Sequence, residues 1–188
     1  SGCLAYEENW KLFQPAWQVI LDREGLPFFH MTDFEAYQDK YKGWSTARHN
    51  SLLTDLVGII VPWTDFAFGR GVAIDDWEHA QTQNDVLKPW SAFSYCVNQC
   101  LHAIAIWANE HNCTGPIIYV FESGDGYDGE LLRRKTEIES SRTSMLRFRW
   151  AGLHIMPKLA IAPFPLTPLQ AADIWAFEAR KEWENKYA

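Results

Sequence analysis

The sequence predicts an α/β fold in which helices flank a sheet of at least three strands. Segments with helical periodicity alternate with short apolar runs bounded by Gly and Pro, which is the pattern of a layered α/β protein. The chain has 188 residues, of which 47% are hydrophobic, and this is enough to bury a substantial core. We therefore expect residues 1–188 to form a single domain, with a purely helical bundle as the structural alternative.

The N-terminal part of the chain predicts helices. Apolar residues recur at intervals of three and four over residues 7–22, and Gly25 follows where a helix would stop. Residues 27–31 read as a short extended piece, after which Thr32 or Asp33 would cap a brief helical turn.

A second long helix is expected from Ser45, as its N-cap, up to Pro62. Residues 64–74 are rich in Phe and Val but contain two glycines, which favours a strand with a bulge or bend. Residues 75–87 are polar and acidic, and one interpretation is a helix that lies over the edge of the sheet.

The central part of the chain predicts its longest helix and its best strand. The helix covers residues 89–111, with Pro89 near its first position. Residues 116–121 form a continuous apolar run, as expected of a strand that is covered on both faces.

Three further elements complete the expected fold. Residues 129–140 are a polar helix candidate, and residues 153–159 are a weaker strand interrupted by Pro157. Thr167 then caps a closing helix that has Pro168 at its first position and runs to about residue 185.

Composition limits the class of protein. No apolar run approaches the roughly 20 residues of a membrane-spanning helix, and the N-terminus lacks a signal pattern, so we expect a cytoplasmic protein without a membrane partner.

The net charge of -7 opposes indiscriminate attraction to a phosphate backbone. A local basic groove is still possible, because six cations lie close together: Arg133, Arg134, Lys135, Arg142, Arg147 and Arg149. A solvated helix face followed by a loop is the simpler interpretation of that cluster.

The 4 cysteines do not form a Cys-x-x-Cys pair, and we interpret them as reduced thiols. Cys96 and Cys100 have helical spacing, with His102 nearby, which could hold a metal. Structural zinc sites usually come as short-spaced pairs, so buried helix cysteines are the better interpretation.

Two carboxylates are the main functional candidates. Glu122 ends the apolar strand, and ligands of α/β sheets bind beyond the carboxyl ends of strands, although an acidic, Gly-rich exit is often only a loop. Asp173 lies on the closing helix among apolar residues, where a buried carboxylate would need a donor, a cation or a metal. The alternative is an Asp on the solvent face, beside Gln170 and Glu178.

Three strings in this order carry a family resemblance. They are residues 168–176 (PLQAADIWA), residues 119–125 (YVFESGD) and residues 29–33 (FHMTD). The chain resembles the domain of unknown function 3800 family, which is similar to ribonuclease H-like domains. The resemblance spans most of the chain and implies a ribonuclease H-like sheet flanked by helices.

The resemblance implies a metal-dependent nuclease that hydrolyses nucleic acid. Glu122 and Asp173 would bind Mg²⁺ or Mn²⁺, and His30 and Asp33 would lie at the rim as a further ligand or a proton-transfer pair. Two divalent ions roughly 3.5 to 4 Å apart can activate a water and stabilise the leaving oxygen. Hard cations of this kind prefer carboxylate oxygens.

One departure from the family pattern favours an alternative. Members typically open with a strand carrying Asp-Glu-Ser-Gly, and this sequence lacks that strand, which either precedes Ser1 or has been lost. Its loss would leave the site short of ligands and remove a central strand unless another strand or chain fills the gap. A non-catalytic binding or interaction module is therefore the second hypothesis. An enzyme that uses His30, His79 or His154 as a general base is the third, and no nucleophile motif supports it.

Overall fold

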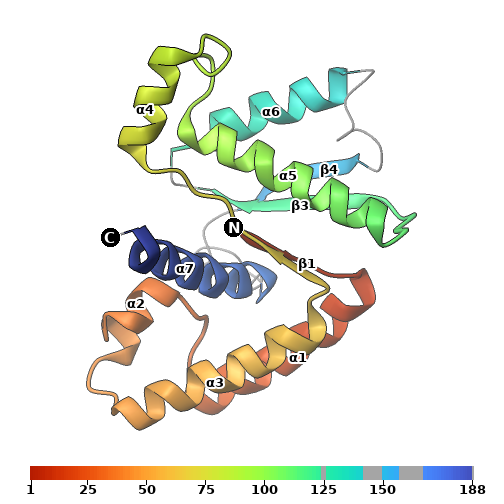
Figure 1. Ribbon diagram of the computed structural model, residues 1–188. Coiled ribbons are helices and arrows are strands. Elements are labelled where there is room, and N and C mark those ends of the chain that lie inside the picture. The colour runs from red at the N-terminus through yellow and green to blue at the C-terminus, as the bar shows by residue number, and fades with distance from the viewer. Residues whose placement is uncertain (124–125, 142–149, 157–166, 188) are drawn as a thin grey trace. The chain divides into compact units, whose positions relative to one another are not determined.

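The computed structural model describes residues 1–123, 126–141, 150–156 and 167–187 (Figure 1). In this part of the chain it contains seven α-helices and two small sheets, one antiparallel and one parallel, so the α/β class is confirmed and most of the structure is helical. Each sheet has two strands, fewer than the three expected in one sheet. The chain divides into two compact units, unit 1 (residues 1–69 and 159–188) and unit 2 (residues 70–158). The single domain stays a prediction.

Unit 1 combines a short antiparallel ribbon with four α-helices and one 3-10 helix. Its strands β1 and β2 pair with Cys3 opposite Ala67. Its elements are β1 (Gly2–Leu4), α1 (Glu7–Glu24), α2 (Met31–Glu35), the 3-10 helix η1 (Asp39–Tyr41), α3 (Thr46–Trp63), β2 (Phe66–Phe68) and α7 (Thr167–Tyr187).

The end of α1 and the start of α3 confirm two predictions. Gly25 follows α1 with φ +69°, a left-handed conformation that glycine adopts without a steric penalty. The Ser45 hydroxyl oxygen accepts a hydrogen bond from the Arg48 backbone N–H at 3.3 Å, which caps α3.

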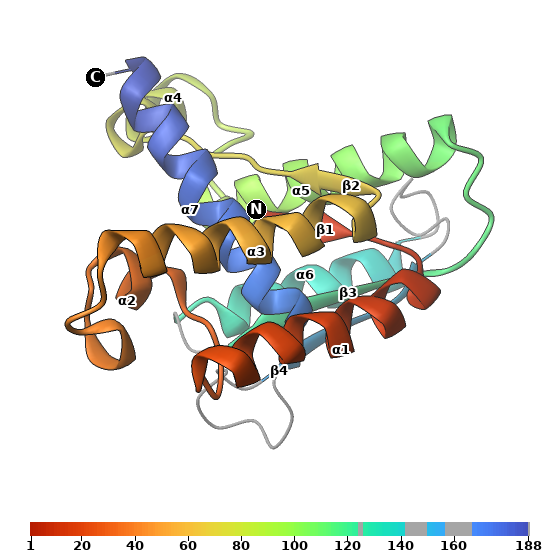
Figure 2. The same ribbon diagram turned by 90° about the horizontal axis from the view of Figure 1, so that it is seen from below.

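Helices α1, α3 and α7 enclose the aromatic core of unit 1. Helix α1 packs against α3 and against α7, and α7 also contacts α2 (Figure 2). The core combines large rings with branched aliphatic side chains, and its fully buried members include Phe13, Trp17, Phe29, Phe34, Leu52, Leu56 and Ala171. Burial of several aromatic rings supplies much of the hydrophobic stabilisation available to a unit of this size.

Unit 2 is built around a parallel strand pair. Strands β3 and β4 run parallel with Tyr119 opposite Leu153, and α6 lies in the connection between them, as parallel strands require. The elements are α4 (Ile74–Gln83), α5 (Ala92–Glu110), β3 (Ile117–Glu122), α6 (Asp128–Ser140) and β4 (Trp150–Met156). The polar helix at 129–140 is therefore confirmed as α6.

Three predictions about unit 2 and its border need correction. Helix α5 begins after Ser91 rather than at Pro89, because the Ser91 hydroxyl accepts from the Ser94 backbone N–H at 3.0 Å. The predicted strand over 64–74 is only the short β2, and α4 already begins at Ile74. Strand β4 begins at Trp150, earlier than expected, and residues 157–159 lie outside the described residues.

Among the described residues, the apolar strand β3 is covered on one face rather than on both faces as predicted. Its burial alternates: the Tyr119 side chain is 7% exposed, whereas Ile118 and Val120 are 59% and 44% exposed. Alternation with a period of two is the pattern of a strand covered on one face. A continuous run of apolar residues does not distinguish a strand covered on one face from a strand covered on both, since both faces carry the same kind of residue.

Two predicted helix caps are also wrong. The N-cap position of α2 is His30, so Thr32 and Asp33 both lie inside the helix. Thr167 is the first residue of α7 rather than its cap, and its buried hydroxyl has no hydrogen-bond partner among the described residues. In the described ranges no helix is both long enough and apolar enough to cross a membrane.

Candidate functional site

Two polar side chains of α7 hold the segment that leads into α2. The Gln170 side-chain oxygen accepts from the Phe29 backbone N–H at 2.7 Å, and Asp173 Oδ2 accepts from the Met31 backbone N–H at 2.7 Å. Residues three apart lie on the same face of a helix, so both side chains reach the same strip of backbone. His30 lies between Phe29 and Met31 in the chain, so the two hydrogen bonds place Asp173 next to His30.

Gln170 is a site residue that the sequence did not reveal. Its side chain is fully buried, which contradicts the alternative interpretation that placed Asp173 on a solvent face beside Gln170. The same oxygen also accepts from the Trp17 indole N–H at 3.1 Å, so Gln170 joins α1, α7 and the segment before α2. Its amide nitrogen is buried without a partner in the described part of the chain.

Asp173 is partly buried, as its apolar neighbours in the sequence indicated. Burial raises the pKa of its carboxyl above the ordinary value, because the charged form loses hydration. The Met31 N–H and nearby His30 oppose this rise in pKa, and the Asp33 carboxylate adds to it. Asp173 is thus a carboxylate held where its negative charge is incompletely compensated.

His30 and Asp33 form a pair beside Asp173. His30 Nδ1 lies 2.9 Å from Asp33 Oδ2, and the two side chains are 42% and 35% exposed. Both residues influence the pKa of Asp173, so the three side chains belong to one electrostatic cluster in unit 1. Both side chains are about half-exposed, and the rim location and chemical role expected for them stay predictions.

A lysine that sequence reasoning missed lies beside this cluster. The Lys40 ammonium nitrogen lies 3.2 Å from the centre of the Phe28 ring, a cation–π contact. Burial lowers the pKa of Lys40, and Asp39 and Asp33 oppose that change. Burial likewise raises the pKa of the Tyr41 hydroxyl, and Asp33 and Asp173 add to this rise. Nothing in the sequence around Lys40 distinguishes it from other surface lysines.

Glu122 lies apart from this cluster along the chain. It is the last residue of β3 in unit 2, and its side chain is exposed. Glu122 belongs to unit 2 and Asp173 to unit 1, so a metal bound by both carboxylates stays a prediction. Among the described residues, no three His, Cys, Asp or Glu side chains are grouped closely enough to hold a metal ion.

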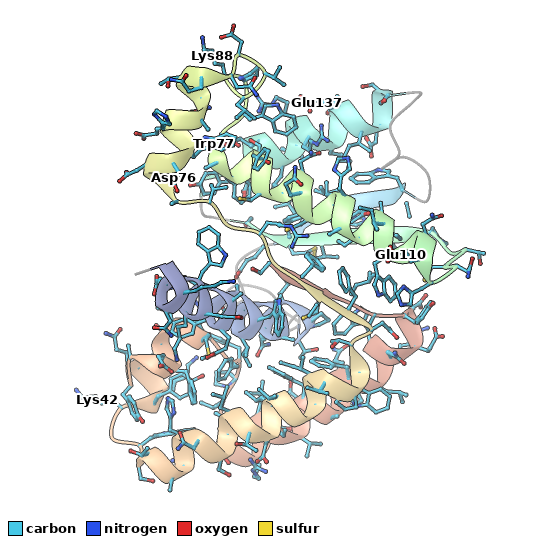
Figure 3. The ribbon with its side chains drawn as sticks, in the orientation of Figure 1. Lys42, Asp76, Trp77, Lys88, Glu110 and Glu137 are labelled. Atoms are coloured by element: carbon cyan, nitrogen blue, oxygen red, sulfur yellow. The ribbon has the colours of Figure 1, made fainter. Side chains whose placement is uncertain are left out.

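The other candidates from the sequence have mainly structural environments. Arg133 and Arg134 of α6 form ion pairs with Glu137 (labelled in Figure 3), with nitrogen–oxygen distances of 3.8 Å and 3.0 Å. Arg142, Arg147 and Arg149 lie outside the described residues. All four cysteines are free thiols, and burial raises the pKa of Cys96 and Cys100.

Comparison with known protein families, curated proteins and solved structures finds no match to this chain.

Proposed function

We propose that the chain is a divalent-metal-dependent nuclease-like domain with a ribonuclease H-like fold, which hydrolyses phosphodiester bonds of nucleic acid. The observation that carries this proposal is the partly buried Asp173 carboxylate, whose pKa is raised by burial and which lies beside the His30–Asp33 pair. Perturbed carboxylates of this kind concentrate at functional sites. The resemblance of residues 29–33, 119–125 and 168–176 to the domain of unknown function 3800 family supports the choice of reaction.

In this proposal, Asp173 and Glu122 supply carboxylate oxygens to Mg²⁺ or Mn²⁺, which prefer such ligands. The metal would polarise the phosphoryl group and lower the pKa of a bound water. The Met31 N–H uses one acceptor site of Asp173 Oδ2, and the carboxylate has further acceptor sites that a cation would use. His30, oriented by Asp33 at 2.9 Å, would accept or deliver a proton at the rim.

The test is cleavage of labelled single- and double-stranded DNA and RNA by the full chain, with Mg²⁺, with Mn²⁺ or with a chelator. Asp173→Asn and Glu122→Gln should each abolish metal-dependent cleavage, because they remove charge at nearly constant shape. Asp76→Asn is the matched control, since Asp76 is an exposed acidic residue in the first turn of α4 (Figure 3). Equal cleavage by all three variants would remove Asp173 and Glu122 from the mechanism.

The second candidate is a non-catalytic binding or interaction module that retains the fold. Its support is a pair of hydrogen bonds, from Met31 N–H to Asp173 and from Phe29 N–H to Gln170. Both bonds hold the backbone before α2 in place, and this structural role explains Asp173 and Gln170 without any catalysis. A metal titration separates the two candidates. If Mn²⁺ stabilises the wild type but not Asp173→Asn against heat, the module hypothesis loses its support.

A further inference from the structure

Unit 2 contains a cleft of about 150 Å³ between α6 and the start of α5. Its walls combine one aromatic ring with both signs of charge, and the residues that matter here are Trp90, Ser94, Glu130, Arg133, Arg134 and Glu137. Pockets for drug-sized ligands usually measure roughly 300 to 1,000 Å³, so this cleft fits a single small ring system.

Hydrogen bonds fix two walls of the cleft. The Gln81 side-chain amide donates to the carbonyl oxygens of Leu87, at 3.1 Å, and Trp90, at 2.7 Å, which anchors the segment that carries the Trp90 ring. Between the start of α5 and α6, the hydroxyls of Ser91 and Ser94 both donate to Oε2 of Glu130. These two hydrogen bonds lower the pKa of Glu130 and keep its carboxylate ionised.

Arg134 leaves one hydrogen-bond donor unused at the cleft. Its guanidinium donates from Nη1 to Glu137 Oε2 at 3.0 Å and from Nη2 to the side chain of Asn98. Its Nε–H is buried and has no acceptor in the described part of the chain. The guanidinium carbon also lies 5.2 Å from the centre of the Trp90 ring. A buried guanidinium N–H without an acceptor is costly, so a small shift of the Arg134 side chain that brings its Nε–H to a ligand oxygen or nitrogen in the cleft is favourable.

The charges around the cleft indicate which ligand fits. Two guanidinium groups and two carboxylates balance each other, so neither a simple anion nor a simple cation gains from the local field. A neutral ligand with an acceptor for Arg134 Nε–H and a donor for the remaining oxygen of Glu130 uses both signs. A flat ring would also stack on Trp90, because aromatic side chains and guanidinium planes are the usual partners of exposed bases.

We propose that this cleft of unit 2 binds one nucleobase, either of a free nucleoside or of a single-stranded nucleic acid. The residues that line the cleft include neither Glu122 nor Asp173, the candidate metal ligands of the proposed nuclease. The cleft therefore requires neither metal nor cleavage, and its test is independent of the nuclease proposal.

The experiment is an NMR titration of the full chain in the presence of a chelator, following the indole N–H signals of its tryptophans. The probes are guanosine, adenosine, cytidine, uridine and a short single-stranded oligonucleotide, with inorganic phosphate and guanidinium as simple ions. At least one nucleoside should shift the Trp90 signal, which is assigned by its disappearance in Trp90→Phe. If the oligonucleotide binds more tightly than its nucleosides, the source is a strand rather than a free metabolite.

Arg134→Gln should weaken nucleoside binding roughly tenfold or more, as expected when a hydrogen bond from a charged donor is lost. Arg180→Gln is the matched control, because the Arg180 guanidinium carbon lies 5.0 Å from the centre of the Phe177 ring, its Nε approaches Glu184 at 3.6 Å, and Arg180 does not line the cleft of unit 2. Circular dichroism melting checks that both variants fold, and Arg133→Gln provides a second variant at the rim of the cleft. The proposal is overturned if no nucleoside shifts the Trp90 signal, if the simple ions shift it equally, or if Arg134→Gln and Arg133→Gln both bind like the wild type.

Discussion

At the scale of single residues, Asp173 combines a favourable hydrogen bond with an unfavourable charge. Asp173→Asn keeps an oxygen that can accept from the Met31 N–H and removes the charge, so we expect the free energy of unfolding at pH 7 to rise. Asp173→Ala removes the acceptor as well and should be less stable than Asp173→Asn by about 1–3 kcal/mol, because a buried N–H is left unsatisfied. Urea unfolding of both variants measures the difference.

The stability difference between Asp173→Asn and the wild type should depend on pH in one direction. The folded-state pKa of Asp173 is raised above the ordinary value of about 3.9, so the folded state holds its proton more tightly than the unfolded state. Wild-type stability then falls as the pH rises between the unfolded-state pKa and the folded-state pKa. The advantage of Asp173→Asn should be full above that interval and should vanish below it. An advantage that grows on acidification would contradict the burial of this carboxylate.

The sequence indicated burial of Asp173 as one of two interpretations but gave no sign of the role of Gln170, and the reason is chain distance. The apolar neighbours of Asp173 lie on its own helix and are visible in any short window. The partners of Gln170 are Trp17 and Phe29, which are separated from it by 153 and 141 positions. No local pattern distinguishes a glutamine that bridges such distant groups from one in solvent.

At the scale of elements, two serine caps allow a matched comparison. The hydroxyls of Ser45 and Ser91 each accept from the backbone N–H three residues later, but only Ser91 also donates to Glu130 of another helix. Ser45→Ala should cost about 1 kcal/mol of stability, the usual loss for an N-cap. Ser91→Ala should cost more, because it also weakens the contact between α5 and α6.

The extra cost of Ser91→Ala should depend on pH. Hydrogen bonds from Ser91 and Ser94 lower the pKa of Glu130, so their contribution is present above the ordinary Glu pKa and is lost as the pH falls through the lowered value. Chemical denaturation of the two variants at neutral and acidic pH measures the effect. Equal costs for Ser45→Ala and Ser91→Ala at neutral pH would show that the contact with Glu130 contributes nothing.

Helix periodicity was the most reliable signal at this scale. Helices α1 and α3 begin and end close to their predicted positions because their caps, Gly25 and Ser45, are local features. Pro89 was misleading, since proline is accepted both in the first turn of a helix and in the preceding segment, and the serine two positions later forms the cap. The one-sided burial of β3 depends on what packs against it, which its sequence does not encode.

At the scale of the whole molecule, each unit has its own buried core. The core of unit 1 includes Ile174 of α7, at 3% exposure, although this helix follows all of unit 2 in the chain. In unit 2, Leu131 of α6 is equally buried, at 2%, and α6 packs on α5 and β4. Two separate cores predict that damage to one unit leaves the other folded.

Ile174→Asp and Leu131→Asp in the full chain test this expectation. Burying an unpaired carboxylate costs several kcal/mol, a large share of the roughly 5–15 kcal/mol that stabilises a domain. Hydrogen exchange followed by mass spectrometry should show α1 and α3 losing protection in Ile174→Asp while α5 stays protected, with the reverse in Leu131→Asp. Loss of protection throughout the chain in both variants would instead show that the two cores unfold as one cooperative domain, which is the organisation that the length of the chain predicted.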